Sequence, residues 1–551
     1  MRSGEVLKSR GLFSKLSMSK PYDARVGRVK NRFVGKLPRL CLPPILALTT
    51  LAAIGGDLRL TEAVKHSDIG AISKLIQTGA DVNAAEIDGT TALHWAVSRD
   101  DLKAVDLLLT AGANVKALNR YGVSPLMIAC NDAGAPVVGR LLKAGADPNS
   151  ASPEGETALM CAARAGKVDV IKALYTAGAD VNSKESWHGQ TALMWAAAED
   201  YSPAIALLKE LGADVNARSD GGFTALLFAV RDGRMEAVQT LVKLGANVND
   251  TIKPAKMAPP RPARPIKGRI INAVSGLPMR FAGPEGTSAL VIAITNAHFE
   301  LAKYLLDQGA DPNAAAQGWT ALHQLEYTRR PDHGKGLPPP EATDTYDSLD
   351  LAKALLARGA NPNARQTAEI NDGQRNYQNR IGATPFFLAA KHADIPMMHL
   401  LAEHGADPRI GTEDGATPLA AAAGVGIWNV GESAGTNEEA FEAVKLAYEL
   451  GSRDVNAADE WGFTPLHGAA LRAADDIVQF LAEKGAKLDA TTKEEQWTPL
   501  RIATGVYYTG TVKLGDSTAA LLRRLMKAQG LPIPEYKNPV DYGMAVKQAY
   551  P

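Results

Sequence analysis

The feature that most constrains this chain is a short pattern that returns along most of its length. A Gly, a Thr or Ser two residues later and then an apolar run first occur together as GTTALHWA at 89–96. The pattern recurs as GVSPLMIA (122–129), GETALMCA (155–162), GQTALMWA (189–196), GFTALLFA (222–229), GTSALVIA (286–293), GWTALHQL (318–325), GATPFFLA (382–389), GATPLAAA (415–422), GFTPLHGA (462–469) and, without the Gly, QWTPLRIA (496–503). The first five glycines are 33, 33, 34 and 33 residues apart. This period predicts one repeated unit rather than the three or four globular domains that 551 residues would otherwise suggest.

A second signature follows about 23 residues after each glycine, in forms such as AGANV, AGADVN and QGADPN. A run such as AVDLLL or VIKALY precedes it. Leu and Ala at helical spacing, followed by a Gly suited to a left-handed cap, predict the end of an amphipathic helix. The first apolar run predicts a shorter helix, with the Thr or Ser as N-cap and Pro or Ala in its first turn. Each unit should therefore contain a turn, two helices and an extended hairpin.

These segments resemble the T-P-L-H-x-A and G-A-D-V-N segments of the ankyrin repeat family, at the family's 33-residue period. The resemblance covers residues 57 to about 530 and implies an all-α repeat solenoid of about twelve units. The first unit, 57–83, keeps the second helix but lacks the opening pattern, as expected of a capping repeat. His94, His323 and His467 occupy the TPLH position, where the resemblance implies that the imidazole braces the neighbouring turn.

Longer steps between glycines mark insertions and set the expected organisation. The chain divides into N-terminal repeats (56–250), an insertion (251–285), C-terminal repeats (286–530) and a tail (531–551). Residues 251–281 hold seven Lys/Arg, six Pro and no acid, which fits either a docking arm for an acidic or polyproline-reading partner or an exposed linker. Further insertions are expected between helices near 327–346, 424–436 and 505–515, and in a hairpin near 366–381. Thr436 and Glu439 predict a capping box after one of them.

The N-terminal segment, residues 1–55, has the order of an export signal. Residues 1–39 carry 11 Lys/Arg against two acids, and the 15 residues LCLPPILALTTLAAI at 40–54 carry no charge. A spanning helix needs roughly 20 apolar residues, and Pro43 and Pro44 interrupt this run. We therefore expect a cleaved signal and a periplasmic or secreted protein. Anchoring by the N-terminal segment and a cytoplasmic location are the alternatives, and Met18 is a second candidate start.

The remaining chain gives little sign of chemistry. Residues 56–551 hold 49 basic and 58 acidic side chains, so a nucleic-acid-binding surface is not expected. Cys130 and Cys161 lie in apolar runs and are interpreted as small core residues. The ten histidines do not cluster at ligand spacings, and HExxH, CxxC and GxSxG are absent. We expect no catalytic residue, metal site or cofactor, and no membrane span beyond the N-terminal segment. An enzyme or enzyme-regulating protein remains an alternative.

The function expected from this organisation is protein binding. Stacked units share one core and leave the hairpin tips and the exposed side of the first helices as a long concave surface. Aromatic and Arg side chains, common anchors of interfaces, flank the repeat glycines. The candidates for contact with an unidentified protein partner are Arg120, Tyr121, Trp187, His188, Phe223, Trp319, Trp461, Phe463 and Trp497. The alternatives are that each ring packs on the next hairpin, and that the protein is a spacer without a specific partner. We expect a monomeric scaffold.

Overall fold

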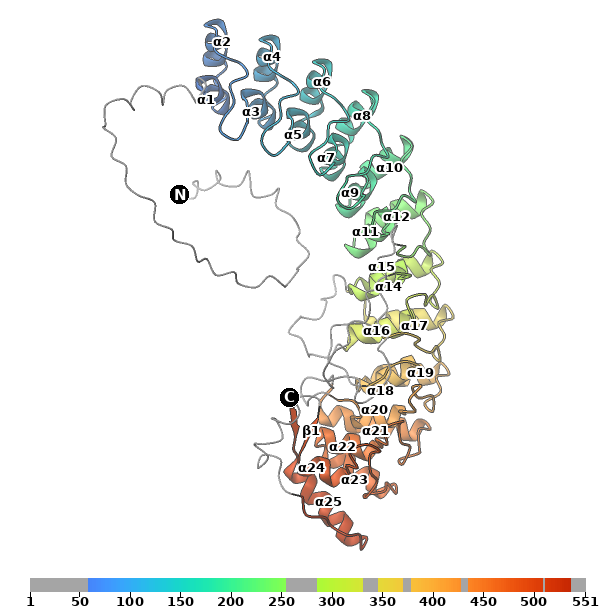
Figure 1. Ribbon diagram of the computed structural model, residues 1–551. Helices are drawn as coiled ribbons and strands as arrows, with labels where there is room; N and C mark the ends of the chain where they lie inside the picture. Colours follow the sequence, from blue (N-terminus) through green and yellow to red (C-terminus); the bar gives the residue numbers. More distant parts are fainter. Residues whose placement is uncertain are drawn as a thin grey trace, which may run out of the picture. The chain divides into compact units, whose positions relative to one another are not determined.

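The computed structural model describes residues 58–253, 285–330, 345–369, 378–427, 435–508 and 511–536. In these ranges the chain forms 24 helices, arranged as twelve units of two helices each (Figure 1). The predicted all-α repeat solenoid is therefore confirmed. Residues 1–55 and most of 251–285 lie outside the described ranges, so the export signal and the role of the basic insertion stay predictions.

The first helix of each unit is short and begins at the recurring Thr or Ser in all units but the first. The first helices are α1 (Arg59–Lys65), α3 (Ala92–Ser98), α5 (Pro125–Asp132), α7 (Ala158–Arg164), α9 (Ala192–Ala198), α11 (Ala225–Arg231), α14 (Ala289–Thr295), α16 (Ala321–Arg329), α18 (Pro385–Lys391), α20 (Pro418–Ala423), α22 (Pro465–Arg472) and α24 (Pro499–Thr504). In α7 the Thr157 hydroxyl accepts a hydrogen bond from the Met160 N–H at 3.3 Å. Such a bond satisfies a backbone donor that the first turn leaves free.

The second helix of each unit ends at the recurring Gly or close to it. The second helices are α2 (Ile69–Gln77), α4 (Leu102–Thr110), α6 (Ala135–Lys143), α8 (Val168–Thr176), α10 (Ser202–Glu210), α12 (Met235–Lys243), α15 (Phe299–Asp307), α17 (Ser348–Ala357), α19 (Ile395–Glu403), α21 (Asn437–Leu450), α23 (Asp475–Glu483) and α25 (Asp516–Ala528). Gly178, which follows α8, has a φ of +97°. Only Gly adopts this left-handed conformation without strain, so the chain can turn out of the helix there.

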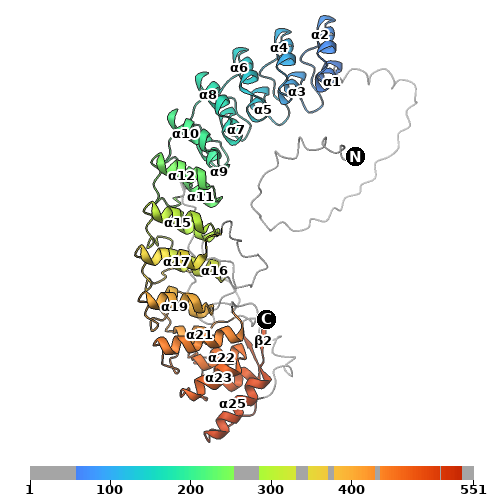
Figure 2. The same cartoon turned by 180° about the vertical axis from the view of Figure 1, so that it is seen from behind.

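The helices stack in two rows. Each first helix contacts the next first helix, as α3 contacts α5 and α20 contacts α22, and second helices pair in the same way, as α8 with α10. Figures 1 and 2 show the two rows running side by side through the units. Leu93, Leu108, Leu126 and Leu141 are buried between them, and one apolar core continues from unit to unit. Each unit therefore depends on its neighbours for much of its burial.

A ladder of asparagines joins the units beyond the second helices. Asn149 donates from Nδ2 to the Gly178 carbonyl at 3.0 Å and accepts from the Asp180 N–H at 2.8 Å. The same two bonds occur at Asn83, Asn182, Asn249, Asn313, Asn363 and Asn456. Lys116, Arg409 and Asp489 stand at this position in three units, where the ladder lacks its amide.

The four insertions lie where the spacing predicts them. Those after α16 and α24 differ in the secondary structure that they contain. Helix α16 continues to Arg329, and the α20 to α21 connection ends at the predicted capping box, in which Glu439 N–H donates to the Thr436 hydroxyl at 3.2 Å. The connection after α24 forms an antiparallel hairpin of β1 (Val506–Tyr508) and β2 (Thr511–Lys513), which the sequence did not indicate. The first unit also contains α1, a helix that its missing opening pattern did not predict.

Candidate functional site

The hairpin tips and the exposed sides of the first helices form one continuous surface, here called the tip face. Neighbouring tips are joined by backbone hydrogen bonds: Arg120 N–H donates to the Asp88 carbonyl at 2.7 Å, and Asp220 N–H donates to the His188 carbonyl at 2.7 Å. These bonds hold successive tips in register. Side chains at the tips are therefore presented at a regular spacing along the stack.

The three histidines of the TPLH position brace the tips, as the resemblance implied. His467 Nδ1 accepts from the Thr464 N–H at 3.1 Å, and its Nε2 lies 3.0 Å from the Trp497 carbonyl in the next unit. Because a carbonyl only accepts, Nε2 carries the proton. His94 and His323 make the same contacts to the carbonyls of Val123 and Ala383.

Burial keeps these imidazoles neutral. Desolvation lowers the pKa of His323 and of His467 to about 4, and it lowers the pKa of His94 as well. A neutral ring can accept at Nδ1 while it donates at Nε2, which is what the brace requires. The side chains of His94, His323 and His467 are used inside the fold rather than presented on the tip face.

The two cysteines of the described residues are also core residues, as predicted. Cys130 and Cys161 are buried and free. Burial raises the pKa of the Cys130 thiol to about 12 and raises that of Cys161 as well. Neither thiol is poised to ionise, which a nucleophile or a metal ligand would need. Among the described residues, no group of three or more His, Cys, Asp or Glu side chains is placed to hold a metal ion.

Four of the predicted contact residues lie exposed in two adjacent pairs. The Tyr121 ring is 53% exposed, and the Arg120 guanidinium lies over it at 4.9 Å and donates to its hydroxyl at 2.7 Å. The Trp187 ring is 57% exposed and stacks on His188 with 4.6 Å between ring centroids. Glu185 fixes this second tip, because its carboxylate accepts from the N–H groups of both Trp187 and His188.

Three further candidates are only partly exposed. Phe223 lies 5.3 Å from Phe228, ring centroid to ring centroid, with Arg231 above both rings. Trp461 and Trp497 are partly buried against the apolar core. These three rings are therefore less exposed than those of Tyr121 and Trp187.

The expectation that all nine candidates stand exposed at the tips is wrong for Trp319 and Phe463. Trp319 is 6% exposed, donates from Nε1 to the Gln324 side chain at 2.9 Å, and belongs to a separate apolar cluster with Tyr327 and Phe387. Residues of later units, among them Ala383 and Ala416, belong to the same cluster and help to bury this ring. Phe463 is buried with its ring edge against His467.

The sequence interpretation missed other exposed apolar side chains of the tip face. Ile87 is fully exposed at the tip before α3, and Leu118 is exposed beside Tyr121. Trp95, Ile128 and Trp195 lie partly exposed on the first helices, each four residues after the N-cap. Aligning the units on the N-cap would have identified this position as a row along the tip face. Ile87 stands two residues before the repeat Gly, as Arg120 and Trp187 do, so aligning the units on that Gly would have identified it. Leu118 shares no such position.

The tip face changes character along the stack. The fourth residue after the N-cap is Leu388 in α18, Ala421 in α20 and Gly468 in α22, and all three are buried. A Cβ added at Gly468 would lie 2.6 Å from the backbone nitrogen of Val425, which belongs to the insertion after α20. At α22 the insertion after α20 therefore lies on a surface that units 2, 3 and 5 leave partly exposed, whereas units 4 and 6 bury Cys161 and Phe228 at this position.

Comparisons with known proteins agree with the repeat architecture. Models of ankyrin repeats match residues 60–152, 126–219 and 188–252, then 290–325 and 446–503, which together are more than half of the chain. A curated protein, alpha-latrocrustotoxin-Lt1a of Latrodectus tredecimguttatus, is 29% identical over 143 residues, which are 26% of this chain and 8% of that protein. The chain thus spans only a small part of this relative's length. None of the helices in the described ranges is both long enough and apolar enough to span a bilayer.

Proposed function

Because the chain belongs to the ankyrin repeat family, we propose that it is a non-catalytic scaffold that binds a protein partner through the tip face of units 2 to 6. Ankyrin repeats generally mediate protein–protein interaction and are typically binding modules without enzymatic activity. The partner, the location of the site and the scaffold role are our proposal.

The assignment of the site to the tip face of the early units rests on one observation. Large apolar side chains stand exposed at the tips before α3, α5 and α9, namely Ile87, Leu118, Tyr121 and Trp187. No described tip from residue 285 onward exposes such a side chain. Exposed apolar side chains rimmed by polar ones mark interaction sites, and Trp and Tyr are frequent anchors. The tips of the early units therefore expose apolar side chains that can anchor a partner, and the described tips of the later units do not.

The test is quantitative capture with a matched control. Immobilised protein carrying Tyr121→Ala and Trp187→Ala should retain less of a specific protein than the wild type, by tenfold or more. Tyr175→Ala is the control, since Tyr175 is also exposed but lies on α8 in the second-helix row. A protein that all three baits retain equally would contradict this site. If no protein is selectively retained, the spacer interpretation is favoured instead.

We also propose that the protein is exported and that residues 1–55 are removed, on the basis of the basic segment followed by the apolar run. Cell fractionation and N-terminal sequencing test this proposal. Full-length protein in the cytosolic fraction would contradict it.

A further inference from the structure

Helix α16 carries a carboxylate where the other units place a core residue. The sixth residue after the N-cap is apolar in ten first helices: Val64, Val97, Cys130, Ala163, Ala197, Val230, Ile294, Ala390, Ala423 and Ala470. In α16 this residue is Glu326, and its side chain is 0% exposed. An ionised carboxylate at such a site needs a compensating charge or hydrogen-bond donors.

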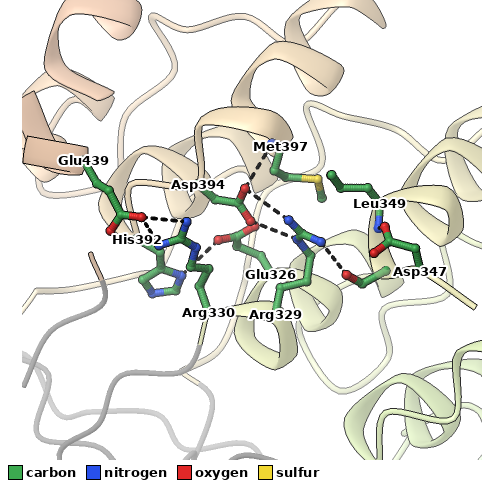
Figure 3. Close-up of polar contacts among 10 residues, drawn as sticks. Glu326, Arg329, Arg330, Asp347, Leu349, His392, Asp394, Met397 and Glu439 are labelled. Carbon is green, nitrogen blue, oxygen red and sulfur yellow. Dashed lines mark hydrogen bonds and ion pairs between the residues drawn. The ribbon is translucent and has the colours of Figure 1, made fainter. Parts of the chain in front are cut away.

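The partner of Glu326 comes from the next unit. Its Oε1 lies 3.2 Å from Nδ1 of His392, the residue that ends α18, and the His392 side chain is also buried (Figure 3). Its Oε2 is buried without a hydrogen-bond partner among the described residues. Burial raises the pKa of the Glu326 carboxyl, and the nearby Asp394 charge adds to this effect, while His392 and Arg329 oppose it.

The other charges around the pair balance one another. Arg329 donates to both carboxylate oxygens of Asp394, from Nε at 2.9 Å and from Nη2 at 3.2 Å, and a third nitrogen donates to the Ser348 hydroxyl (Figure 3). Arg330 pairs with Glu439 of α21 at 3.2 Å.

The remaining helices that contact α16 add no buried counter-charge in the described structure. Helix α14 has no charged residue, Asp350 and Lys353 of α17 form an exposed pair with each other, and Lys391 of α18 is partly exposed. Arg329 and Asp394 balance each other's charge. Among the described residues, the charge of an ionised Glu326 is therefore left to be balanced by a proton on the Glu326–His392 pair.

We propose that Glu326 and His392 together hold one proton that fastens unit 8 to unit 9, and that loss of this proton at alkaline pH loosens the joint. Whether the proton sits on the imidazole or on the carboxyl, the buried pair is then neutral overall. Without it, a net negative charge is buried between α16 and α18. The proton belongs to the pair, because strongly interacting groups titrate as one system.

The joint also reaches the part of the chain that covers the tip face. The His392 ring packs edge-on against Tyr327 at 6.1 Å, and the Tyr327 hydroxyl donates to the Gln366 side chain at 2.8 Å. Arg380 lies over the same ring at 5.2 Å, and it is paired with the buried Glu369 at 2.8 Å. We call Gln366–Glu369 and Gln378–Ile381 the strap. A shift of His392 therefore disturbs Tyr327, on which both ends of the strap rest.

The sign of the pH effect follows from proton counts. An unfolded glutamate and histidine titrate near pH 4.3 and 6.5, so the unfolded pair holds one proton between these values and none well above the second. We expect the folded pair to keep its proton to higher pH, because loss of the proton would leave a net negative charge buried between the two helices. Stability at this joint is therefore fully present near pH 6 and falls as pH rises above about 6.5, by tenfold in the local opening equilibrium per pH unit while one proton is released on opening.

Hydrogen exchange of the full chain between pH 6 and 9, corrected for the intrinsic rate, tests the proposal. In the wild type, protection of amides in 387–394 and 366–369 should fall about tenfold per pH unit in this range. Glu326→Gln should abolish this slope, because the amide has no proton to lose. Glu439→Gln should keep it, since that carboxylate pairs with Arg330 outside the buried pair. A wild-type slope near zero, or an equal slope in Glu326→Gln, would overturn the proposal.

A second variant keeps the proposal testable if Glu326→Gln does not fold. Glu326→Ala places at this position the residue that units 9 and 10 already have, Ala390 and Ala423. It should fold and should lose the pH slope in the same amides. A persistent slope in this variant would assign the titration to another group and overturn the proposal. The inference concerns units 8 and 9 alone and does not depend on the proposed function.

Discussion

In units 2, 3 and 5 the fourth residue after the N-cap is large and partly exposed, namely Trp95, Ile128 and Trp195. In units 9 to 11 the same position holds Leu388, Ala421 and Gly468, all of them buried. The helices and caps of the two regions are alike. Part of the difference arises from an insertion, because Val425, which follows α20, lies against Gly468 of α22 in the next unit.

This contrast shows that one repeat architecture can leave its tip face open or fill it with its own chain. A filled face behaves as core, so its aromatic residues should matter for stability. An open face should tolerate the same substitutions. Paired substitutions, one in each region, therefore test whether the two regions differ in this way.

The largest difference is expected between two tip tryptophans, Trp187, which precedes its repeat Gly, and Trp319, which follows its own. Trp319→Ala should destabilise unit 8 by about 3–5 kcal/mol, because it removes a buried ring and leaves a cavity. Trp187→Ala should change the stability of unit 5 by no more than about 0.5 kcal/mol. Native-state hydrogen exchange of the two units measures both. Equal losses of stability would mean that the Trp187 ring contributes as much to folding as the Trp319 ring, which would contradict the contrast.

A pair of helical glycines gives the next difference. Gly468→Ala in α22 should cost about 1–3 kcal/mol, since the new Cβ would meet the backbone of Val425. Gly139→Ala in α6 has nothing within 4 Å and should stabilise its helix by about 0.5–1 kcal/mol. Thermal unfolding of the two variants provides the check. A neutral Gly468→Ala would show that the insertion after α20 moves aside easily.

A pH-dependent difference is expected at a pair of equivalent tip residues. Asp459 accepts from the N–H groups of Trp461 and Phe463, as Asn119 does from Tyr121 and Val123. Burial, together with the charge of Asp414, raises the pKa of Asp459 to about 7. A raised pKa means that the stability contributed by this group is present below pH 3.8 and is lost as pH rises through 7.

Asp459→Asn should therefore stabilise unit 11 above pH 7, on the order of 1–2 kcal/mol after local relaxation, and have no such effect near pH 4. The amide keeps the acceptor that Asn119 already provides in unit 3. Urea unfolding at pH 4, 6 and 8 gives the profile. The measurement of the same variant at pH 4 serves as the internal control. A gain that does not vary with pH would assign the effect to packing rather than to charge.

Much of the architecture was predictable because its determinants are local. The N-cap hydroxyls, the left-handed glycines and the capping box at Thr436 each act within a few residues, and the TPLH histidines act across one repeat. Which tip rings are exposed depends also on contacts with other units. Trp187 stands two residues before its repeat Gly and Trp319 directly after its own, and only Trp319 belongs to an apolar cluster with residues of later units such as Phe387 and Ala416. Glu326 was detectable in principle, because aligning the units places it among apolar residues.

The smallest expected effect restores a missing step of the asparagine ladder in the open region. Lys116→Asn should place an amide where it can donate to the Gly145 carbonyl and accept from the Asp147 N–H, as Asn149 does with Gly178 and Asp180 in the following unit. Two exposed hydrogen bonds between units should add about 0.5–1.5 kcal/mol. Lys116→Gln is the control, because it removes the same charge but its longer side chain does not match the ladder geometry. Protection of amides in α4 and α6 should rise only with the asparagine, since the bonds tie these two units together. An equal rise with glutamine would attribute the gain to loss of the lysine charge.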